Sequence, residues 1–195
     1  ILPIEAEQAD GKILVVDRDQ AVRDDATLEG MKDLKPAFKP DGVITPGNSS
    51  PLNAAASSMI LMSKETAKKK GIQPMATIRS IGFAGVDPSV MGVGPVPASR
   101  MALEKAGLQA KDIDYWELNE AFTIVVLNCI KELGIDPDRV NVMGGGTAIG
   151  HPLGATGIRL VGTLARILKI KSGRYGLANA CVGGGQGVAT IIERE

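Results

Sequence analysis

Residues 113–133 read IDYWELNEAFTIVVLNCIKEL, and the spacing of the apolar side chains changes partway along this stretch. The run at 113–118 is short and rich in aromatic and aliphatic residues, which predicts a strand. From residue 119 the apolar residues recur every three or four positions, which predicts a helix over about 119–133. A strand that turns directly into a helix is the repeating unit of an α/β fold.

The same alternation continues on both sides of this unit. The further strands are expected at about 75–83, 140–143, 175–181 and 187–192, and the further helices at about 96–106 and 155–169. From residue 75 the order is therefore βαβαβαββ, which predicts a layered α/β/α domain with helices packed on its sheet. The last two strands are expected to form a hairpin around Gly183-Gly184-Gly185.

The first third of the chain has fewer predicted strands. The start of the chain and residues 12–17 have the composition of short strands, and Thr27 opens a short helix that ends before Pro36. A longer amphipathic helix is expected over about 51–70, with its cap at Asn48-Ser49-Ser50. The apolar stripe of this helix consists of Leu52, Ala56, Met59 and Ile60. Because the helix has few strands to pack against, the first third looks like a remnant of another domain.

The composition is that of a globular protein with an aliphatic core, since 44% of the residues are hydrophobic but only 3% are aromatic. Twenty-two basic residues balance 22 acidic ones, so we expect no nucleic-acid partner. No apolar run approaches the ~20 residues of a membrane span, and no targeting segment is recognisable at the start. The chain begins at Ile1 rather than at methionine, so we expect a piece of a longer or two-part protein.

The two cysteines lie far apart in dissimilar contexts, which indicates neither a disulfide framework nor a metal site. A reducing compartment, and hence a cytoplasmic location, is expected. Cys129 shares the apolar helical stripe of the opening stretch and is assigned to the core. Cys181 ends a predicted strand just before glycines whose N–H groups could form an oxyanion site, although a cysteine there could also be a buried apolar residue.

Two further segments carry residue types of a catalytic site. Asn119 stands at a strand-to-helix turn, where side chains reach the edge of a sheet, but it could also be no more than a helix cap. His151, the only histidine, lies in the six-glycine run of residues 144–157. A phosphate-binding loop is the competing interpretation of that run, but the run lacks the lysine and the spacing that such loops need.

Together, NEAF at 119–122, GHPLGATG at 150–157 and CVGGGQG at 181–187 resemble three motifs of the thiolase family, in the order in which that family carries them. The stretches at 27–38, 47–62 and 91–99 are similar to the family as well. The resemblance implies a thiolase-like fold with three parts. Residues 1–47 would be the end of the loop domain, 48–72 the last segment of the N-terminal domain, and 73–195 the C-terminal domain.

The resemblance also implies roles for the site residues. Cys181 would exchange a proton with the substrate's α-carbon, and His151 would activate the acyl-accepting nucleophile and donate to the thioester oxygen. Asn119 would position a water that completes one oxyanion hole with His151, and the Gly183 N–H would belong to a second. The positions that match the coenzyme A channel and the acyl pocket are Ser50 and Arg23 for the channel, and Met91 and Phe122 for the pocket. Glycine N–H groups and a histidine near Cys181 are expected to favour its thiolate.

The function expected is coenzyme A-dependent cleavage of a 3-ketoacyl-CoA to acetyl-CoA and a shortened acyl-CoA, or the reverse condensation. Coenzyme A would be a substrate, with no covalently bound cofactor and no metal. Thiolases take their nucleophilic cysteine from an N-terminal half, so this chain alone is not expected to catalyse the full reaction. The complete protein is expected to be a dimer or tetramer.

Two features depart from the family or refine the expectation. Pro51 and Asn53 stand where thiolases commonly carry a glycine and an acidic residue, beside Ser50 of the coenzyme A channel. The form HPLGAT at 151–156 and Gln186 are more similar to degradative 3-ketoacyl-CoA thiolases than to acetoacetyl-specific ones. The alternatives are a non-catalytic thiolase-like chain that binds coenzyme A or acts as a scaffold, and a nucleotide-phosphate-binding module.

Overall fold

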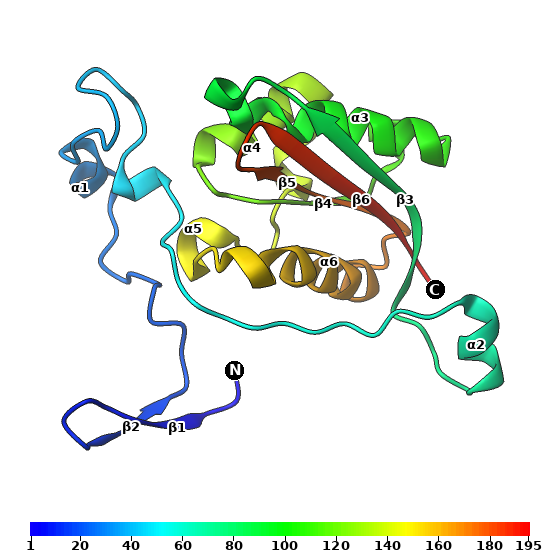
Figure 1. Ribbon diagram of the computed structural model, residues 1–195, viewed down its shortest axis with the longest axis horizontal. Helices are drawn as coiled ribbons and strands as arrows, with labels where there is room; N and C mark the ends of the chain where they lie inside the picture. The colour runs from blue at the N-terminus through cyan, green and yellow to red at the C-terminus, as the bar shows by residue number, and fades with distance from the viewer.

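The computed structural model describes residues 1–195 and is organised around a four-stranded sheet (Figure 1). The strand order is β3-β6-β5-β4, and only β4 and β5 run parallel. The strands span Ala76–Gly85 (β3), Tyr115–Leu118 (β4), Tyr175–Val182 (β5) and Gln186–Arg194 (β6). The strands predicted at these four places are confirmed.

Helices cover both faces of the sheet, as the sequence predicts. Helices α3 (Pro95–Ala106) and α4 (Thr123–Leu133) lie on one face, and α6 (Leu153–Ile170) lies on the other (Figure 1). Successive residues of a strand point to opposite faces, so β4 contributes Trp116 to the core under α3 and α4 and Tyr115 to the core under α6. The structure therefore has the three layers expected of this domain.

Helix α4 begins at Thr123, four residues later than predicted. Residues 119–122 stay extended because Ser49 and Phe122 form an isolated antiparallel bridge, and the Ser50 N–H donates to the Ala121 carbonyl at 3.2 Å. The N-cap position belongs to Phe122. Asn119 is therefore not a helix cap, and the structural interpretation of that residue was wrong.

No strand forms at 140–143, where the sequence predicts one. Val140 makes only a single bridge with Trp116, and Asn141 then adopts a left-handed backbone with φ 47°. A left-handed residue followed by Gly144-Gly145-Gly146 cannot continue a ladder, so the chain turns into a short helix, α5 (Gly146–Ile149), that was not predicted. The connection from β4 to β5 therefore holds the α-helices α4, α5 and α6, a 3-10 turn at Pro137–Arg139 and no strand.

The hairpin between β5 and β6 is confirmed. Val182 pairs with Gln186, and the glycine triplet makes the turn between them. Gly184 and Gly185 have φ values of 88° and 85°, which residues with a side chain rarely adopt. Because β4 and β5 are parallel, the end of β5 before this turn lies on the same side of the sheet as the end of β4.

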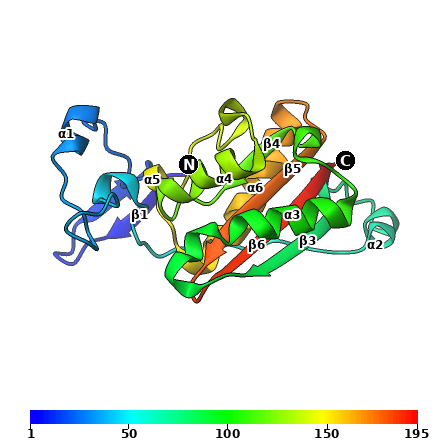
Figure 2. The same ribbon diagram turned by 90° about the horizontal axis from the view of Figure 1, so that it is seen from above.

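Residues 1–48 lie to one side of the sheet domain, and the following segment runs past the domain to its other side (Figure 2). Strands β1 (Ile4–Glu7) and β2 (Ile13–Val16) form a two-stranded antiparallel hairpin, and α1 (Leu28–Lys32) starts after the cap Thr27. These short elements are confirmed. None of the helices in the structure is both long and apolar enough to cross a membrane.

The long helix predicted over about 51–70 is wrong. Residues 51–63 are extended and exposed, and only α2 (Lys64–Lys69) is helical. Leu52 and Ile60 of the predicted stripe are 79% and 84% exposed, so nothing in this chain packs on them. A short helix without tertiary packing is marginal in water, whereas the extended segment gains a hydrogen bond from the His151 N–H to the Pro51 carbonyl at 2.9 Å. Since no helix starts at Pro51, the cap predicted at 48–50 is also wrong.

Candidate active site

Asn119, His151 and Cys181 belong to three segments that meet at the carboxyl end of β4 and β5. Asn119 directly follows β4, and its N–H donates to the Asn179 carbonyl of the parallel neighbour β5 at 2.9 Å. Cys181 lies two residues farther along β5. Ligand sites of α/β sheets form at this end of parallel strands, because the connections there leave a crevice.

His151 is in direct contact with Asn119; Asn119 is buried and His151 is partly buried. The Asn119 Nδ2 and the His151 Nε2 lie 3.3 Å apart, and only 1% of Asn119 is exposed. Of the predicted catalytic residues, these two are joined by a hydrogen bond. The sequence separates them by 31 residues, so the fold alone creates this pair.

A threonine at the start of α6 determines which nitrogen of His151 carries the proton. The Thr156 hydroxyl lies 2.7 Å from His151 Nδ1 and donates its proton to the Pro152 carbonyl at 2.9 Å. With its proton directed to that carbonyl, the hydroxyl oxygen accepts from Nδ1–H, and this hydrogen-bond pattern assigns the ring proton to Nδ1. Nε2 then keeps its lone pair, and Asn119 must present its amide N–H to it. The site thus holds an imidazole whose free nitrogen is aimed at Asn119.

The imidazole of His151 is the neutral form at pH 7. Burial lowers its pKa below the usual value, and the positive charge of Arg159 lowers it further. A neutral histidine with a free Nε2 can accept a proton from a bound substrate. The pair is therefore arranged for general base chemistry.

Cys181 behaves differently from the expectation. Its side chain is 9% exposed, and burial raises the pKa of the thiol above its ordinary value, with only a smaller opposing contribution from a backbone hydrogen bond. The prediction that nearby glycines and a histidine favour the thiolate is therefore wrong for this chain, because the loss of water outweighs the available donors. Cys181 is a protonated thiol at neutral pH.

Cys129 lies in the core, as predicted. Its side chain is completely buried in α4, next to the Asn179 amide, and burial raises the pKa of its thiol to about 12. A thiol with that pKa is inert at neutral pH. Cys129 therefore cannot serve as a nucleophile.

Of the other predicted site residues, Ser50 and Gly183 lie close to Asn119 or Cys181, whereas Arg23 forms no hydrogen bond or ion pair with them. The Ser50 Oγ donates to the Ala121 carbonyl at 3.3 Å, two residues after Asn119, so Ser50 lies beside the site. Gly183 lies in the turn directly after β5, with open space next to its Cα. Arg23 is exposed between β2 and α1, and no hydrogen bond or ion pair joins it to the other site residues.

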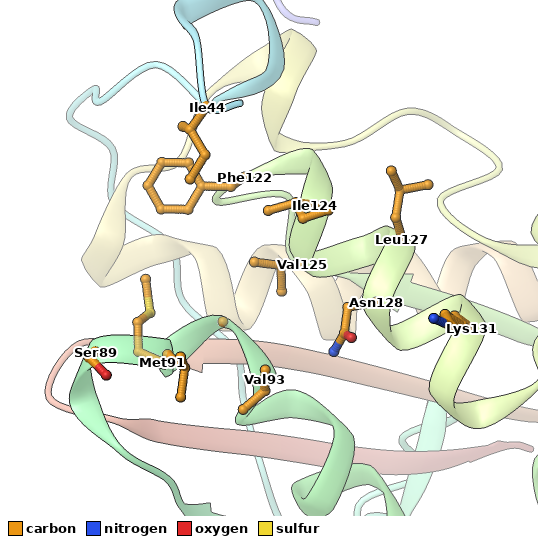
Figure 3. A pocket seen from close by; sticks show the side chains of 12 residues that line it. Ile44, Ser89, Met91, Val93, Phe122, Ile124, Val125, Leu127, Asn128 and Lys131 are labelled. Carbon is orange, nitrogen blue, oxygen red and sulfur yellow. The ribbon is translucent and has the colours of Figure 1, made fainter. Parts of the chain in front are cut away.

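Met91 and Phe122 line the same cavity, which has a volume of about 500 Å³ (Figure 3). Side chains from α4 face those of the 3-10 segment Pro88–Val93 across it. The lining consists of Ile44, Ser89, Val90, Met91, Gly92, Val93, Phe122, Ile124, Val125, Leu127, Asn128 and Lys131. Phe38 packs edge-on against Phe122, with 5.9 Å between ring centroids. A largely apolar cavity of this size suits an aliphatic ligand group.

The sequence reasoning missed a buried charged pair beneath the site. Glu117 on β4 is completely buried, and its carboxylate lies 3.5 Å from the Arg159 guanidinium of α6. Burial raises the pKa of Glu117 to about 7, although Arg159 acts in the opposite direction. A charged residue inside an otherwise apolar strand was the available signal. No group of three or more histidine, cysteine or acidic side chains in the structure could hold a metal ion.

Comparison with known proteins gives one family for both parts of the chain. The family model described as the thiolase C-terminal domain matches residues 72–194, and the model described as the thiolase N-terminal domain matches residues 1–65. A 3-ketoacyl-CoA thiolase of Marinobacter nauticus is 46% identical over 198 residues, which cover 100% of this chain and 51% of the relative.

Solved structures agree with this match. The acetyl-CoA acetyltransferase of Bacillus anthracis has a TM-score of 0.93 at 46% identity, over 100% of this chain and 49% of that protein. Human mitochondrial 3-ketoacyl-CoA thiolase in complex with CoA has a TM-score of 0.86 at 39% identity, over 99% of this chain and 48% of that protein. The chain therefore spans about half the length of the relatives it matches.

Proposed function

Because the chain belongs to the thiolase family, we propose that it supplies the acid/base part of an acyltransferase that cleaves 3-ketoacyl-CoA with coenzyme A. The observation that carries the proposal is the Asn119–His151 pair, in which Thr156 leaves the Nε2 lone pair free. Neither a phosphate-binding module nor a scaffold chain needs such a pair. The reverse condensation uses the same groups.

The first chemical step is cleavage of the carbon–carbon bond, which leaves the enolate of acetyl-CoA. The nucleophilic cysteine that receives the shortened acyl group comes from outside this chain, since Cys129 is buried and inert. The enolate carbon needs a proton, and the raised pKa of the Cys181 thiol suits it to donate one. The proton on Cys181 thus moves to the substrate's α-carbon, and the thiol becomes a thiolate.

The second step returns the acyl group to coenzyme A. His151 Nε2 takes the proton of the incoming coenzyme A thiol as the sulfur attacks the acyl group. The resulting Nε2–H and a water positioned by Asn119 would be two donors for one oxyanion, and one such donor is worth about 3 kcal/mol in an acyl-transfer site. The Gly183 N–H is the donor proposed for the other oxygen. The bond from the acyl carbon to the external cysteine then breaks and releases that cysteine as a thiolate. The proton on His151 finally returns to the Cys181 thiolate, which restores both groups.

Substrate contacts belong to the same proposal. The cavity lined by Met91 and Phe122 would hold part of the acyl group, and Ser50 and Arg23 would lie along coenzyme A. A relative with the same fold has been crystallised with CoA, which supports coenzyme A as a substrate. A 3-ketoacyl substrate longer than acetoacetyl-CoA is the substrate class we favour.

The surroundings of the chain are also part of the proposal. Residues 1–47, 48–72 and 73–195 would be the loop-domain end, the last N-terminal segment and the C-terminal domain of a complete enzyme that is a dimer or tetramer. Both cysteines are free thiols, which suits a reducing, cytoplasmic location.

The test joins this chain to the N-terminal half of the Marinobacter nauticus 3-ketoacyl-CoA thiolase and measures thiolysis of acetoacetyl-CoA and of a longer 3-ketoacyl-CoA. We expect cleavage by the joined protein and none by the chain alone. His151→Ala should lose at least about a hundredfold in kcat, because general base and oxyanion donor are removed together. Glu104→Gln, an exposed change on α3, is the control. Coenzyme A binding without any cleavage would favour the non-catalytic alternative.

A further inference from the structure

A side chain outside the motifs extends the sheet next to the active site. The Asn141 Oδ1 accepts the Leu118 N–H at 2.8 Å, and the Asn141 Nδ2 donates to the Leu118 carbonyl at 2.9 Å. The amide group thereby takes the place of a neighbouring strand for the last residue of β4. The left-handed backbone of Asn141, with φ 47°, turns the chain so that this amide faces β4. Asparagine is among the few residues that tolerate that conformation.

The Asn141 amide also takes part in a connection between β4 and the glycine-rich run. The Asn141 Nδ2 also donates to the Glu120 Oε1 at 2.7 Å, and the Glu120 Oε2 accepts the Thr147 N–H at 2.9 Å. Thr147 lies in the first turn of α5, within the glycine-rich run. Glu120 therefore links the end of β4 to that run. A Cβ on Gly145 would displace the Glu120 carboxylate from this position.

These hydrogen bonds connect the two segments that carry Asn119 and His151. Asn119 stands between Leu118 and Glu120, each of which is tied to Asn141. His151 follows α5 by two residues, and α5 is tied to Glu120. The separation of Asn119 and His151 is thus determined by a short chain of hydrogen bonds rather than by packing alone.

We propose that Asn141 and Glu120 are positioning residues that set the separation and orientation of Asn119 and His151. Their role in catalysis rests on the proposed thiolase reaction. Their structural role, which is to position Asn119 and His151, does not depend on that reaction. Charge is the competing explanation, because Glu120 also lies near the cationic Arg159. The two explanations separate cleanly, since Asn141 carries no charge.

Two substitutions test the positioning. Glu120→Gln keeps the shape but replaces one of two acceptor oxygens by an amide donor, so one of its two partners is left without an acceptor. Asn141→Gly keeps the backbone conformation and removes the side chain without changing any charge. Glu104→Gln is the matched control for the first, because it removes an exposed carboxylate from α3.

His151 is the only histidine, so nitrogen NMR of the chain reports on one imidazole. We expect the unsubstituted chain and the control to show the Nδ1–H form. Both Glu120→Gln and Asn141→Gly should shift the His151 Nε2 resonance toward that of a ring nitrogen without a hydrogen bond, because the Asn119 amide moves out of reach while Thr156 still holds Nδ1. An unchanged Nε2 resonance in folded samples of both variants would overturn the proposal, and a change in Glu120→Gln alone would assign the effect to charge and overturn it too.

A measurement on the unsubstituted chain keeps the test decisive if the variants unfold. The Thr147 amide should exchange with solvent at least about tenfold more slowly than the amide of exposed Met143 in the same loop. Equal exchange rates would contradict the Glu120 bond on which the proposal depends.

The activity of the joined enzyme tests whether the positioning by Asn141 and Glu120 matters for catalysis. Glu120→Gln and Asn141→Gly should lower kcat about tenfold or more and leave KM within about twofold, because misplaced groups weaken the transition state rather than substrate binding. Normal kcat in both variants would show that the positions do not serve the reaction. If the unsubstituted joined enzyme shows no thiolysis, the proposed function fails, while the NMR result still decides the positioning.

Discussion

The imidazole of His151 illustrates how single contacts decide chemistry at the residue scale. The Thr156 hydroxyl donates its one hydrogen bond to the Pro152 carbonyl, and this pattern assigns the ring proton of His151 to Nδ1. Cys181 shows the opposite case. Its glycine neighbours are present as the motif requires, but burial dominates and keeps the thiol protonated. Residue identity alone does not fix a protonation state.

Glu117 gives a prediction at this scale. Burial raises its pKa from 4.5 to about 7, so between these values the folded chain binds a proton that the unfolded chain releases. Stability from this site is fully present below the unfolded pKa and is lost as the pH rises through about 7. Between pH 4.5 and pH 7.5, ionisation of Glu117 should lower the free energy of unfolding by at most about 3 kcal/mol. We expect Glu117→Gln to abolish this decrease.

The measurement is the free energy of urea unfolding of both proteins across this pH range. The lowered pKa of His151 has the opposite effect, making stability rise with pH, but it is common to both proteins and cancels in the difference. Parallel pH profiles would show that Glu117 is ionised in the folded chain throughout.

At the element scale, helix α3 is seated on the sheet by a contact between two backbones. Gly94, at the start of α3, lies directly against Gly187 of β6, and a Cβ on Gly187 would overlap the Gly94 carbonyl. Glycine is needed here for close approach. The same helix supplies Ala98 and Ala102 to the main core, so any displacement of α3 loosens that core.

Two glycine substitutions with opposite expected signs test this contact. Gly187→Ala should lower the free energy of unfolding by about 1–3 kcal/mol, because α3 has to move away from β6. Gly162→Ala, inside α6 with open space beside it, should raise the free energy by up to about 1 kcal/mol through helix propensity. Denaturant unfolding measures both. A tolerated Gly187→Ala would mean that α3 does not depend on this approach.

At the scale of the whole molecule, the chain combines a layered domain with a loosely attached first third. The extended residues 51–63 connect them along α6, held by the Asn53 and Ser57 side chains, which donate to the carbonyls of Ile149 and Ala155 at 3.2 and 3.0 Å. Leu52, Ile60 and Leu61 project into solvent. Several exposed apolar residues on one segment are typical of a surface that contacts other protein.

Limited proteolysis should detect this division. We expect chymotrypsin to cut first within 51–63, because exposed extended backbone fits a protease and the sheet domain does not. Mass spectrometry should then find a resistant product that contains α3, α4 and α6. First cleavage inside α6 would show that the layered domain is the less stable part.

By itself the sequence determined the α/β class, the four strands of the sheet and the three main helices. Apolar residues that recur every 2 or 3.6 positions, and glycines at turns, are local properties of the sequence. They predict an element correctly where that element packs within its own domain. The motifs around Asn119, His151 and Cys181 likewise consist of neighbouring residues. They identified the thiolase family before any contact was known.

Only the tertiary structure decided the rest. The extended state of 51–63, the late start of α4 and the missing strand at 140–143 depend on contacts of Pro51 with His151, of Ser49 with Phe122 and of Asn141 with Leu118. The protonated state of Cys181 and the tautomer of His151 depend on burial and on a carbonyl acceptor. Most of these are interactions between residues distant in the chain or effects of burial, which local sequence patterns do not report. The His151 tautomer depends on nearby residues, but on their side-chain geometry rather than on their order in the sequence.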